Sequence, residues 1–221
     1  MNILVVEVTD LDSILITFDC SVIIMMKIKL EIRRLILMNA IKELFLMQQA
    51  YATLFSLTNK VQIVGDKYLE GLTSRQYMTM VALAHLEEDE RTINNIARKL
   101  GTTKQSVKQL INIMEEKGYI KTVPSIKDRR AVNVRITEEG IDVLIKCDEL
   151  GIYLLADIFK NLSSSEIETL WILLKKIYCF DGEEQDGFEA DGVLSLDKDL
   201  SKLRERVFKE FERRRNLKEE S

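Results

Sequence analysis

The chain has 221 residues, 46% of them hydrophobic, which is enough for one well-buried domain with extensions or for two small domains at most. Nine Gly, a single Pro and 31% charged residues favour a mainly helical protein with a minor strand component. Three widely separated cysteines and a single histidine argue against a disulfide framework or a structural zinc site, and predict a reducing compartment.

An apolar run near the N-terminus, Ile14 to Leu30, is interrupted by Asp19, Lys27 and Lys29. A membrane-spanning helix needs about 20 nearly uncharged residues. A signal peptide needs a basic start and a small-residue cleavage site, which this run lacks. We therefore expect a cytoplasmic protein with no membrane partner. Residues 1–37 have no consistent period, and we assign them as an N-terminal extension of unknown role.

Apolar residues recur at three- and four-residue steps over most of the chain, which predicts a succession of helices. Capping boxes at Thr73 to Gln76 and at Ser163 to Glu166 mark two helix starts. Thr137 caps a third helix, which begins with two acidic residues. The expected helices cover residues 41–69, 73–86, 93–100, 103–117, 137–159, from 163 onwards and 196–218, and the expected strands cover 119–123 and 131–136.

The C-terminal region has a different composition from the rest of the chain. Residues 181–192 are acidic and Gly-rich, which predicts a linker or mobile loop. The following helix carries an apolar stripe that needs a partner surface, in the same chain or in another. This stripe consists of Leu200, Leu203, Val207, Phe208 and Phe211. We therefore divide the chain into the extension 1–37, a main domain 38–180 and a C-terminal region 181–221.

The stretch from Ile93 to Ile120 fits a helix-turn-helix. Ala97 is small at the point where two helices must cross closely, and Gly101 supplies the left-handed conformation that ends the first helix. Val107 packs back into the angle between the two helices. A capping box from Thr102 to Gln105 is expected to start the second helix.

The second of these helices has a polar and basic outward face. Such side chains bridge phosphates or hydrogen-bond to base edges when the helix enters the major groove of DNA. An ordinary helical hairpin with a solvated face is the alternative. Ten cations minus three acids give the segment Arg98–Arg135 a charge of +7, so the rest of the chain carries −11, and this segregation favours a polyanion-binding patch. The outward face consists of Lys104, Gln105, Lys108, Gln109 and Asn112.

A hairpin with a basic tip follows the helix-turn-helix. The sequence KGYI leads into a strand, DRR stands at the tip, and an alternating strand ends in ITEEG. In the second strand, Val132, Val134 and Ile136 are expected on one face and Asn133 and Arg135 on the other. This order of elements resembles the MarR family of winged-helix transcription regulators over roughly residues 41–180.

The resemblance implies a mainly α fold with a small β-hairpin wing, in a homodimer with N- and C-terminal extensions. It also implies a transcription regulator, by expectation a repressor, that binds roughly palindromic double-stranded DNA and is released by a small aromatic effector. The family's wing pattern falls on Asp128 and Arg130, where the Asp orients the Arg and the Arg enters the minor groove. Arg129 is expected to contact phosphate. The candidate DNA-binding residues are Thr103, Lys104, Gln105, Ser106, Lys108, Gln109, Asn112, Lys127, Asp128, Arg129 and Arg130.

Catalytic and metal-binding signals are not recognisable in the sequence. It contains no Gly-rich phosphate loop, metal-ligand cluster or paired nucleophile and base, so we expect no enzyme, no cofactor and no metal. The peroxide-sensing branch of the family keeps its reactive Cys in the first domain helix, where this chain has none. We therefore favour buried structural roles for Cys147 and Cys179 over redox sensing. His85 is expected to cap a helix or to face solvent.

Two further expectations concern partners. An effector pocket would be lined by core residues such as Tyr51, Phe55 and Met80. The main alternative function is a protein-interaction adaptor on a winged-helix scaffold, with the C-terminal helix as its docking element. In that case the basic wing would be incidental.

Overall fold

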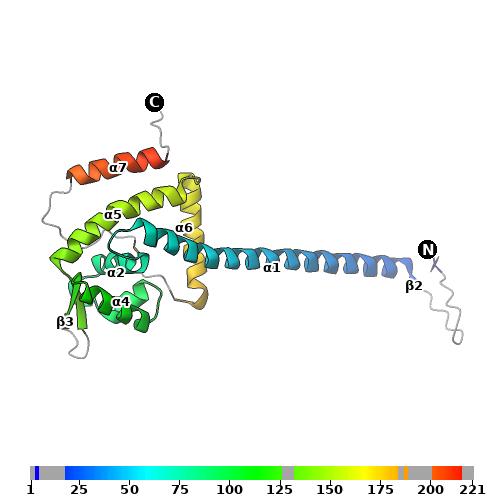
Figure 1. The fold of residues 1–221 in the computed structure, drawn as a ribbon. Helices are drawn as coiled ribbons and strands as arrows, with labels where there is room; N and C mark the ends of the chain where they lie inside the picture. Colours follow the sequence, from blue (N-terminus) through cyan, green and yellow to red (C-terminus); the bar gives the residue numbers. More distant parts are fainter. Residues whose placement is uncertain (1–2, 5–17, 126–131, 184–186, 189–200, 216–221) are drawn as a thin grey trace. The chain divides into compact units, whose positions relative to one another are not determined.

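The computed structural model describes residues 3–4, 18–125, 132–183, 187–188 and 201–215. Its contacts divide the chain into two compact units, Met1–Asn59 and Lys60–Ser221. The described elements, drawn in Figure 1, are β1 (Ile3–Leu4), β2 (Phe18–Asp19), α1 (Cys20–Tyr68), α2 (Ser74–Ala84), η1 (Glu88–Glu90), α3 (Ile93–Lys99), α4 (Lys104–Glu116), β3 (Ile120–Pro124), β4 (Val132–Ile136), α5 (Glu138–Phe159), α6 (Ser164–Tyr178), η2 (Cys179–Asp181) and α7 (Ser201–Arg215).

The first helix is longer than the sequence pattern predicts. It begins at Cys20 rather than near Ile41 and runs without a break to Tyr68. No Gly or Pro occurs between Ser21 and Val64, and the Leu, Met, Lys and Glu residues of this stretch propagate a helix well. Nearly all of its apolar side chains are exposed within the single chain. Because they lie all around the helix, the apolar residues of its first half show no clear helical period in the sequence.

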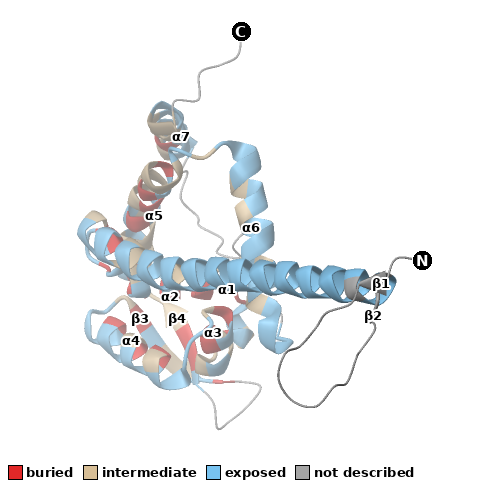
Figure 2. Ribbon diagram, turned by 90° about the vertical axis from the view of Figure 1, so that its right-hand side faces the viewer, coloured by how far each residue is buried: buried red, intermediate tan, exposed pale blue. Residues whose placement is uncertain are grey.

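The core of the second unit lies where α2, α3, α4, α5 and the β3–β4 sheet meet, and Figure 2 shows the buried residues gathered there. Helix α2 is the central core helix, as predicted, because Met80 and Leu83 are fully buried. Burying a side chain of this size stabilises the fold by about 1.5–3 kcal/mol relative to its exposed state. The other large side chains that are fully buried include Ile96, Val107, Ile111, Met114, Ile120 and Val134.

Three predicted helix caps are confirmed. Thr73 and Ser163 each accept a hydrogen bond from the backbone three residues on, and the side chains of Gln76 and Glu166 complete both capping boxes. Thr137 accepts from the backbone of Gly140 at the start of α5. Each cap satisfies a backbone donor that would otherwise lack a partner.

Strands β3 and β4 form the antiparallel stem of the hairpin, with Ile120 opposite Ile136. The predicted alternation in β4 is only partly right. Asn133 is 6% exposed, whereas Val132 is 41% exposed. The Asn133 side chain donates to the Glu88 carbonyl over 3.0 Å, so η1 covers the face that the pattern assigns to solvent.

The C-terminal helix α7 packs against α5 within the same chain. Val207 is 4% exposed in this contact, whereas Phe208 on the same stripe is 57% exposed. Arg206 pairs with Glu149 at 2.8 Å, and two turns further on Arg214 pairs with a carboxylate of α5 at 2.7 Å. The predicted stripe therefore has its partner surface in its own chain. The first predicted stripe residue, Leu200, lies outside the described residues.

Candidate nucleic-acid interface

Helices α3 and α4 form the predicted helix-turn-helix. Gly101 has a φ of +58°, the left-handed conformation expected where α3 ends. The backbone N–H of Thr102 then donates to the Ala97 carbonyl over 3.0 Å and closes the turn. Ala97 and Val107 are buried where the two helices cross, so the small residue and the inward-facing residue occupy their predicted places.

Helix α4, the second helix of this motif and by convention its recognition helix, has one buried face and one exposed face. Val107, Ile111 and Met114 are almost completely buried, so they fix the rotation of the helix about its axis. The opposite face carries the five polar side chains predicted for it, and all five are exposed: Lys104, Gln105, Lys108, Gln109 and Asn112.

The start of α4 differs from the predicted capping box by one residue. The N-cap is Thr103, not Thr102, and its hydroxyl accepts from the backbone N–H of Ser106 over 3.2 Å. The Thr103 and Ser106 hydroxyls are also within 2.9 Å of each other. Both side chains are therefore used in the cap, at a helix N-terminus whose dipole favours anions.

The stem of the wing is tied to the recognition helix. Glu115 of α4 accepts hydrogen bonds from both the backbone N–H and the hydroxyl of Thr122 in β3, each over 2.8 Å. An acid inside the basic segment thus has an internal structural role. The predicted wing-tip residues Lys127, Asp128, Arg129 and Arg130 lie outside the described residues.

The cations counted in the sequence are not all exposed. Lys99 is only 6% exposed, and its Nζ donates to the Gly187 carbonyl over 2.8 Å. Arg135 pairs with Glu88 at 3.7 Å, and Lys117 donates to the Gly71 carbonyl over 3.2 Å. Lys99 follows Ile96 by three residues and so lies on the same, buried face of α3. A helical-wheel plot of this helix would have predicted the burial of Lys99.

The segment after α6, predicted as a linker or mobile loop, is in part packed against the helix-turn-helix. The Phe188 ring lies 4.9 Å from the Lys99 Nζ and meets the ring of His85 edge-on at 5.4 Å. His85 is the C-cap of α2, as predicted, and its Nδ1 lies 2.9 Å from the Val81 carbonyl oxygen. For Gly187 and Phe188, the linker prediction is therefore wrong.

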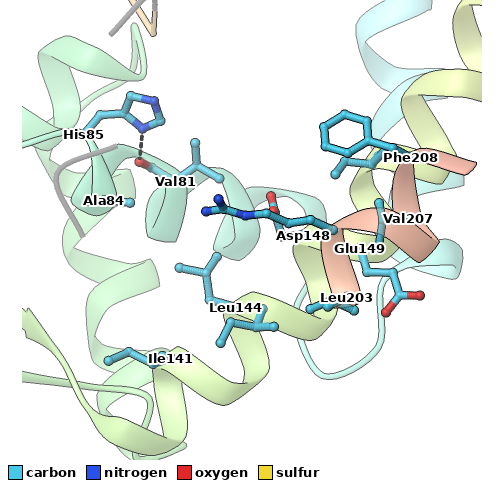
Figure 3. Close-up of a pocket in the computed structure, with 13 residues that line it drawn as sticks. Val81, Ala84, His85, Ile141, Leu144, Asp148, Glu149, Leu203, Val207 and Phe208 are labelled. Atoms are coloured by element: carbon cyan, nitrogen blue, oxygen red, sulfur yellow. Dashed lines mark hydrogen bonds between the residues drawn. The ribbon is translucent and has the colours of Figure 1, made fainter. Parts of the chain in front are cut away.

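A pocket of about 230 Å³ lies between α2, α5 and α7 (Figure 3). Its lining does not include any of the three residues expected for an effector pocket. Met80 is fully buried in the core instead. The pocket was not predictable from the main domain alone because α7 forms one wall. The labelled lining residues are Val81, Ala84, His85, Ile141, Leu144, Asp148, Glu149, Leu203, Val207 and Phe208.

The two carboxylates that line this pocket accept hydrogen bonds from tyrosines. Tyr77 donates to Asp148 over 3.0 Å, and Tyr153 donates to Glu149 over 2.9 Å. Burial, reinforced by the Asp148 carboxylate, raises the pKa of Tyr77, so it stays a donor at all ordinary pH values. Both carboxylates therefore have hydrogen-bond partners that orient them at the edge of a cavity whose other polar lining residues are His85 and Arg204.

The two described cysteine thiols have different environments. Cys147 is fully buried and donates to the Glu70 carbonyl over 3.2 Å, and burial raises the pKa of its thiol. Its predicted structural role is consistent with this environment. Cys179 is exposed, contrary to prediction, because it lies just past the end of α6 and outside the core.

Within the described ranges, the structure contains no cluster of His, Cys, Asp and Glu residues that could hold a metal ion. Likewise, no helix among the described residues is long and apolar enough to span a membrane.

Comparison with known proteins finds similarity over the helix-turn-helix and the first strand of the hairpin. Residues 70–131 match the model of the MarR family. The HTH-type transcriptional regulator PapX of Escherichia coli is 26% identical over 107 residues, covering 48% of this chain and 65% of PapX. The matched region thus spans less than two thirds of that relative.

Solved structures resemble the same part of the chain. A complex of S. aureus MepR with DNA is 26% identical, with a TM-score of 0.52, and the match covers 58% of this chain and 96% of MepR. A mutant of MarR from E. coli complexed with operator DNA has 23% identity and a TM-score of 0.51, over 57% of this chain and 91% of MarR. The latter similarity is one of fold.

Proposed function

We propose that this chain is a regulator of transcription of the MarR family, which binds specific DNA sequences and acts as a repressor; the match of residues 70–131 to the model of that family supports this. The observation that carries the proposal is the two-sided recognition helix. One face of α4 is locked into the core, and the other presents a row of exposed amide and ammonium groups. Such a helix fits the major groove of double-stranded DNA.

The exposed residues of α4 divide by chemistry. Gln105, Gln109 and Asn112 carry amides, which hydrogen-bond to base edges and so discriminate sequence. Lys104 and Lys108 carry point charges, which suit phosphates and give affinity without sequence preference. Thr103 and Ser106, which cap the N-terminus of the helix, lie at its positive end and are proposed to contact the phosphate backbone of the duplex.

The tip of the wing is proposed to reach the adjacent minor groove. Arg130 inserts there, Asp128 orients it, and Lys127 and Arg129 contact phosphates. An Arg in a narrow groove reads shape and negative potential rather than base identity. Arg130→Ala should therefore weaken binding more at A·T-rich flanks than at G·C-rich flanks.

We also propose a homodimer that binds a roughly palindromic site. Helix α6 exposes an apolar face within the single chain, including Trp171 at 49% and Ile177 at 52%. A patch of this kind on a soluble protein indicates a protein contact. A two-fold dimer would place its recognition helices about one DNA turn, roughly 34–36 Å, apart.

The pocket between α2, α5 and α7 is proposed to take the small aromatic effector. Its volume of about 230 Å³ suits a single ring, and its lining is mostly apolar, with the carboxylates of Asp148 and Glu149 and the side chains of His85 and Arg204 as its polar groups. Phenol is a suitable probe. It should raise the unfolding midpoint and lower the affinity for DNA, and Leu144→Trp, which fills the pocket, should abolish both effects.

A salt titration with random duplex DNA tests the main proposal. A dimer that neutralises several phosphates per subunit should lose affinity steeply as salt rises. A flat response, or no binding, would favour an adaptor built on the winged-helix scaffold. If affinity does fall steeply with salt, selection from a random duplex pool should return a palindromic consensus. The half-site spacing of that consensus would report the dimer geometry. The same proposal places the protein in the cytoplasm.

A further inference from the structure

A carboxylate enters the DNA-facing side of the helix-turn-helix from a distant part of the chain. Glu183 follows η2 and lines an open hollow of about 630 Å³ together with residues of α3, the turn and the start of α4. Asp181, two residues earlier, accepts a hydrogen bond from the Glu183 backbone N–H over 3.1 Å. The other residues lining the hollow are Asn94, Ala97, Arg98, Thr102, Thr103 and Lys104.

This hollow lies where a DNA phosphate is expected. In helix-turn-helix complexes the first helix crosses the backbone, and the N-terminal end of the second enters the groove. Arg98 and Lys104 supply positive charge there, and the N-terminus of α4 adds its dipole. A carboxylate offers the same anionic oxygens as a phosphate, so Glu183 and DNA would use the same positive surface.

Contacts on both sides hold the described part of the acidic region in this place; we call residues 181–183 with Gly187 and Phe188 the acidic segment. On one side, Tyr178 at the end of α6 lies against the turn. Its hydroxyl oxygen is so close to Gly101 that a Cβ atom added to this glycine would be 3.0 Å from it. On the other side, Lys99 donates to the Gly187 carbonyl and lies against the Phe188 ring. Lys99 is 6% exposed, so this second contact is built into the structure rather than resting on its surface.

We propose that the acidic segment after α6 is an intramolecular competitor of DNA, with Glu183 as its main charge and Asp181 beside it. The inference rests on the proposed function and adds a regulatory device to it. While the segment is docked, its carboxylates reduce the positive potential at the start of α4. DNA must displace the segment or bind against its charge, so the affinity of the protein is set below what its recognition helix alone would give.

The test is neutralisation of the two acids. Asp181→Asn keeps the acceptor for the Glu183 backbone, and Glu183→Gln keeps the size of the side chain. The matched control is Glu205→Gln with Glu212→Gln, two exposed acids of α7, which changes the net charge by the same amount. Affinity for a random duplex is measured by fluorescence anisotropy over a series of salt concentrations, with thermal unfolding of each protein as a check on folding.

The neutralised protein should bind about two- to tenfold more tightly than the control at low salt, since exposed charge interactions are individually modest. Its affinity should also fall more steeply with salt. If the neutralised protein bound DNA and the control did not, the evidence for an intramolecular competitor would be stronger still. Equal affinities and salt slopes for the neutralised and control proteins would overturn the competitor while leaving DNA binding intact. Failure of every form to bind would overturn the proposed function and the competitor with it.

Phe188→Ala gives a second readout without a change in charge. It removes the ring that packs on Lys99 and His85, so the segment should dock less often. The affinity for DNA should then rise in the unmodified acidic background but not in the neutralised one. A similar rise in both backgrounds would show that Phe188 acts through another route.

Discussion

Gly140, the third residue of α5, has no room for a side chain. A Cβ built there would overlap the carbonyl oxygen of Tyr119 and lie 2.9 Å from the Ile136 side chain. The same carbonyl accepts the backbone N–H of Thr137 over 3.0 Å, which joins β3 to the start of α5. Gly140→Ala must therefore move backbone, because a carbonyl cannot rotate away as a side-chain hydroxyl can.

The expected cost follows from three contributions. Overpacking costs about 1–3 kcal/mol, and weakening the Thr137 hydrogen bond costs about 1 kcal/mol. Replacing Gly by Ala inside a helix stabilises the folded state by about 1 kcal/mol, which offsets part of this cost. Because the clash is with backbone, we expect the upper end, about 3 kcal/mol of lost unfolding free energy. In a chain of this size that lowers the melting temperature by roughly 6–12 °C.

Gly65→Ala is the matched control, since Gly65 is also inside a helix. Its Cβ would meet the Ser74 hydroxyl, which can turn aside at the loss of its hydrogen bond to the Gln62 carbonyl. That loss of about 1 kcal/mol is offset by the gain of about 1 kcal/mol for Ala in a helix, so the melting temperature should change little. Both variants are measured by circular dichroism at 222 nm during heating, with urea unfolding as a second measure. The reasoning would be refuted if Gly140→Ala melted within about 2 °C of Gly65→Ala, because a 2 °C difference corresponds to less than about 1 kcal/mol.

Three further predictions concern binding, assembly and pH. Lys108→Ala should weaken binding to all DNA sequences alike and reduce the slope of log K against log salt by about 1, as measured by anisotropy; a sequence-dependent loss would contradict a phosphate contact. Trp171→Asp should shift the protein toward monomer in sedimentation velocity, whereas an unchanged dimer would exclude α6 from the interface. Arg213 and Arg214 donate to Glu210 and lower its pKa to about 2 from 4.5. The contribution of this carboxylate to the stability of α7 is thus complete above pH 4.5 and lost as the pH falls toward 2. The difference in melting temperature between the protein and Glu210→Gln should therefore be present at pH 6 and shrink as the pH falls toward 2, and an equal difference at both pH values would contradict this reasoning.

The helix-turn-helix was predictable because its determinants are local. Ala97 and Val107 are only ten residues apart in sequence, with Gly101 between them. Each of the three meets a steric requirement of the turn itself. The one-residue error at the cap has a local cause too. Thr102 fits the capping-box pattern with Gln105, whereas Thr103 has Ser106 at the corresponding position and so does not. The helix nevertheless starts after Thr103, whose hydroxyl accepts from the Ser106 backbone and lies within 2.9 Å of its hydroxyl.

The remaining features depend on contacts between distant residues, which no local pattern contains. Asn133 is buried because the Glu88 carbonyl, 45 residues earlier, accepts its side-chain amide. Lys99 is buried because Gly187 and Phe188, nearly 90 residues later, pack over it. The pocket of Figure 3 likewise needs Val207, on a helix that the sequence left without an assigned partner.

These long-range contacts change the meaning of the +7 segment. Lys99, Lys117 and Arg135 donate to, or pair with, groups of their own chain, and Glu183 joins the surface from outside the segment. The field at the start of α4 is therefore weaker than a count along the sequence implies while the C-terminal segment is docked. It strengthens when that segment leaves. Because both states place the same α4 side chains toward DNA, the segment would adjust affinity and salt dependence without changing which bases are read.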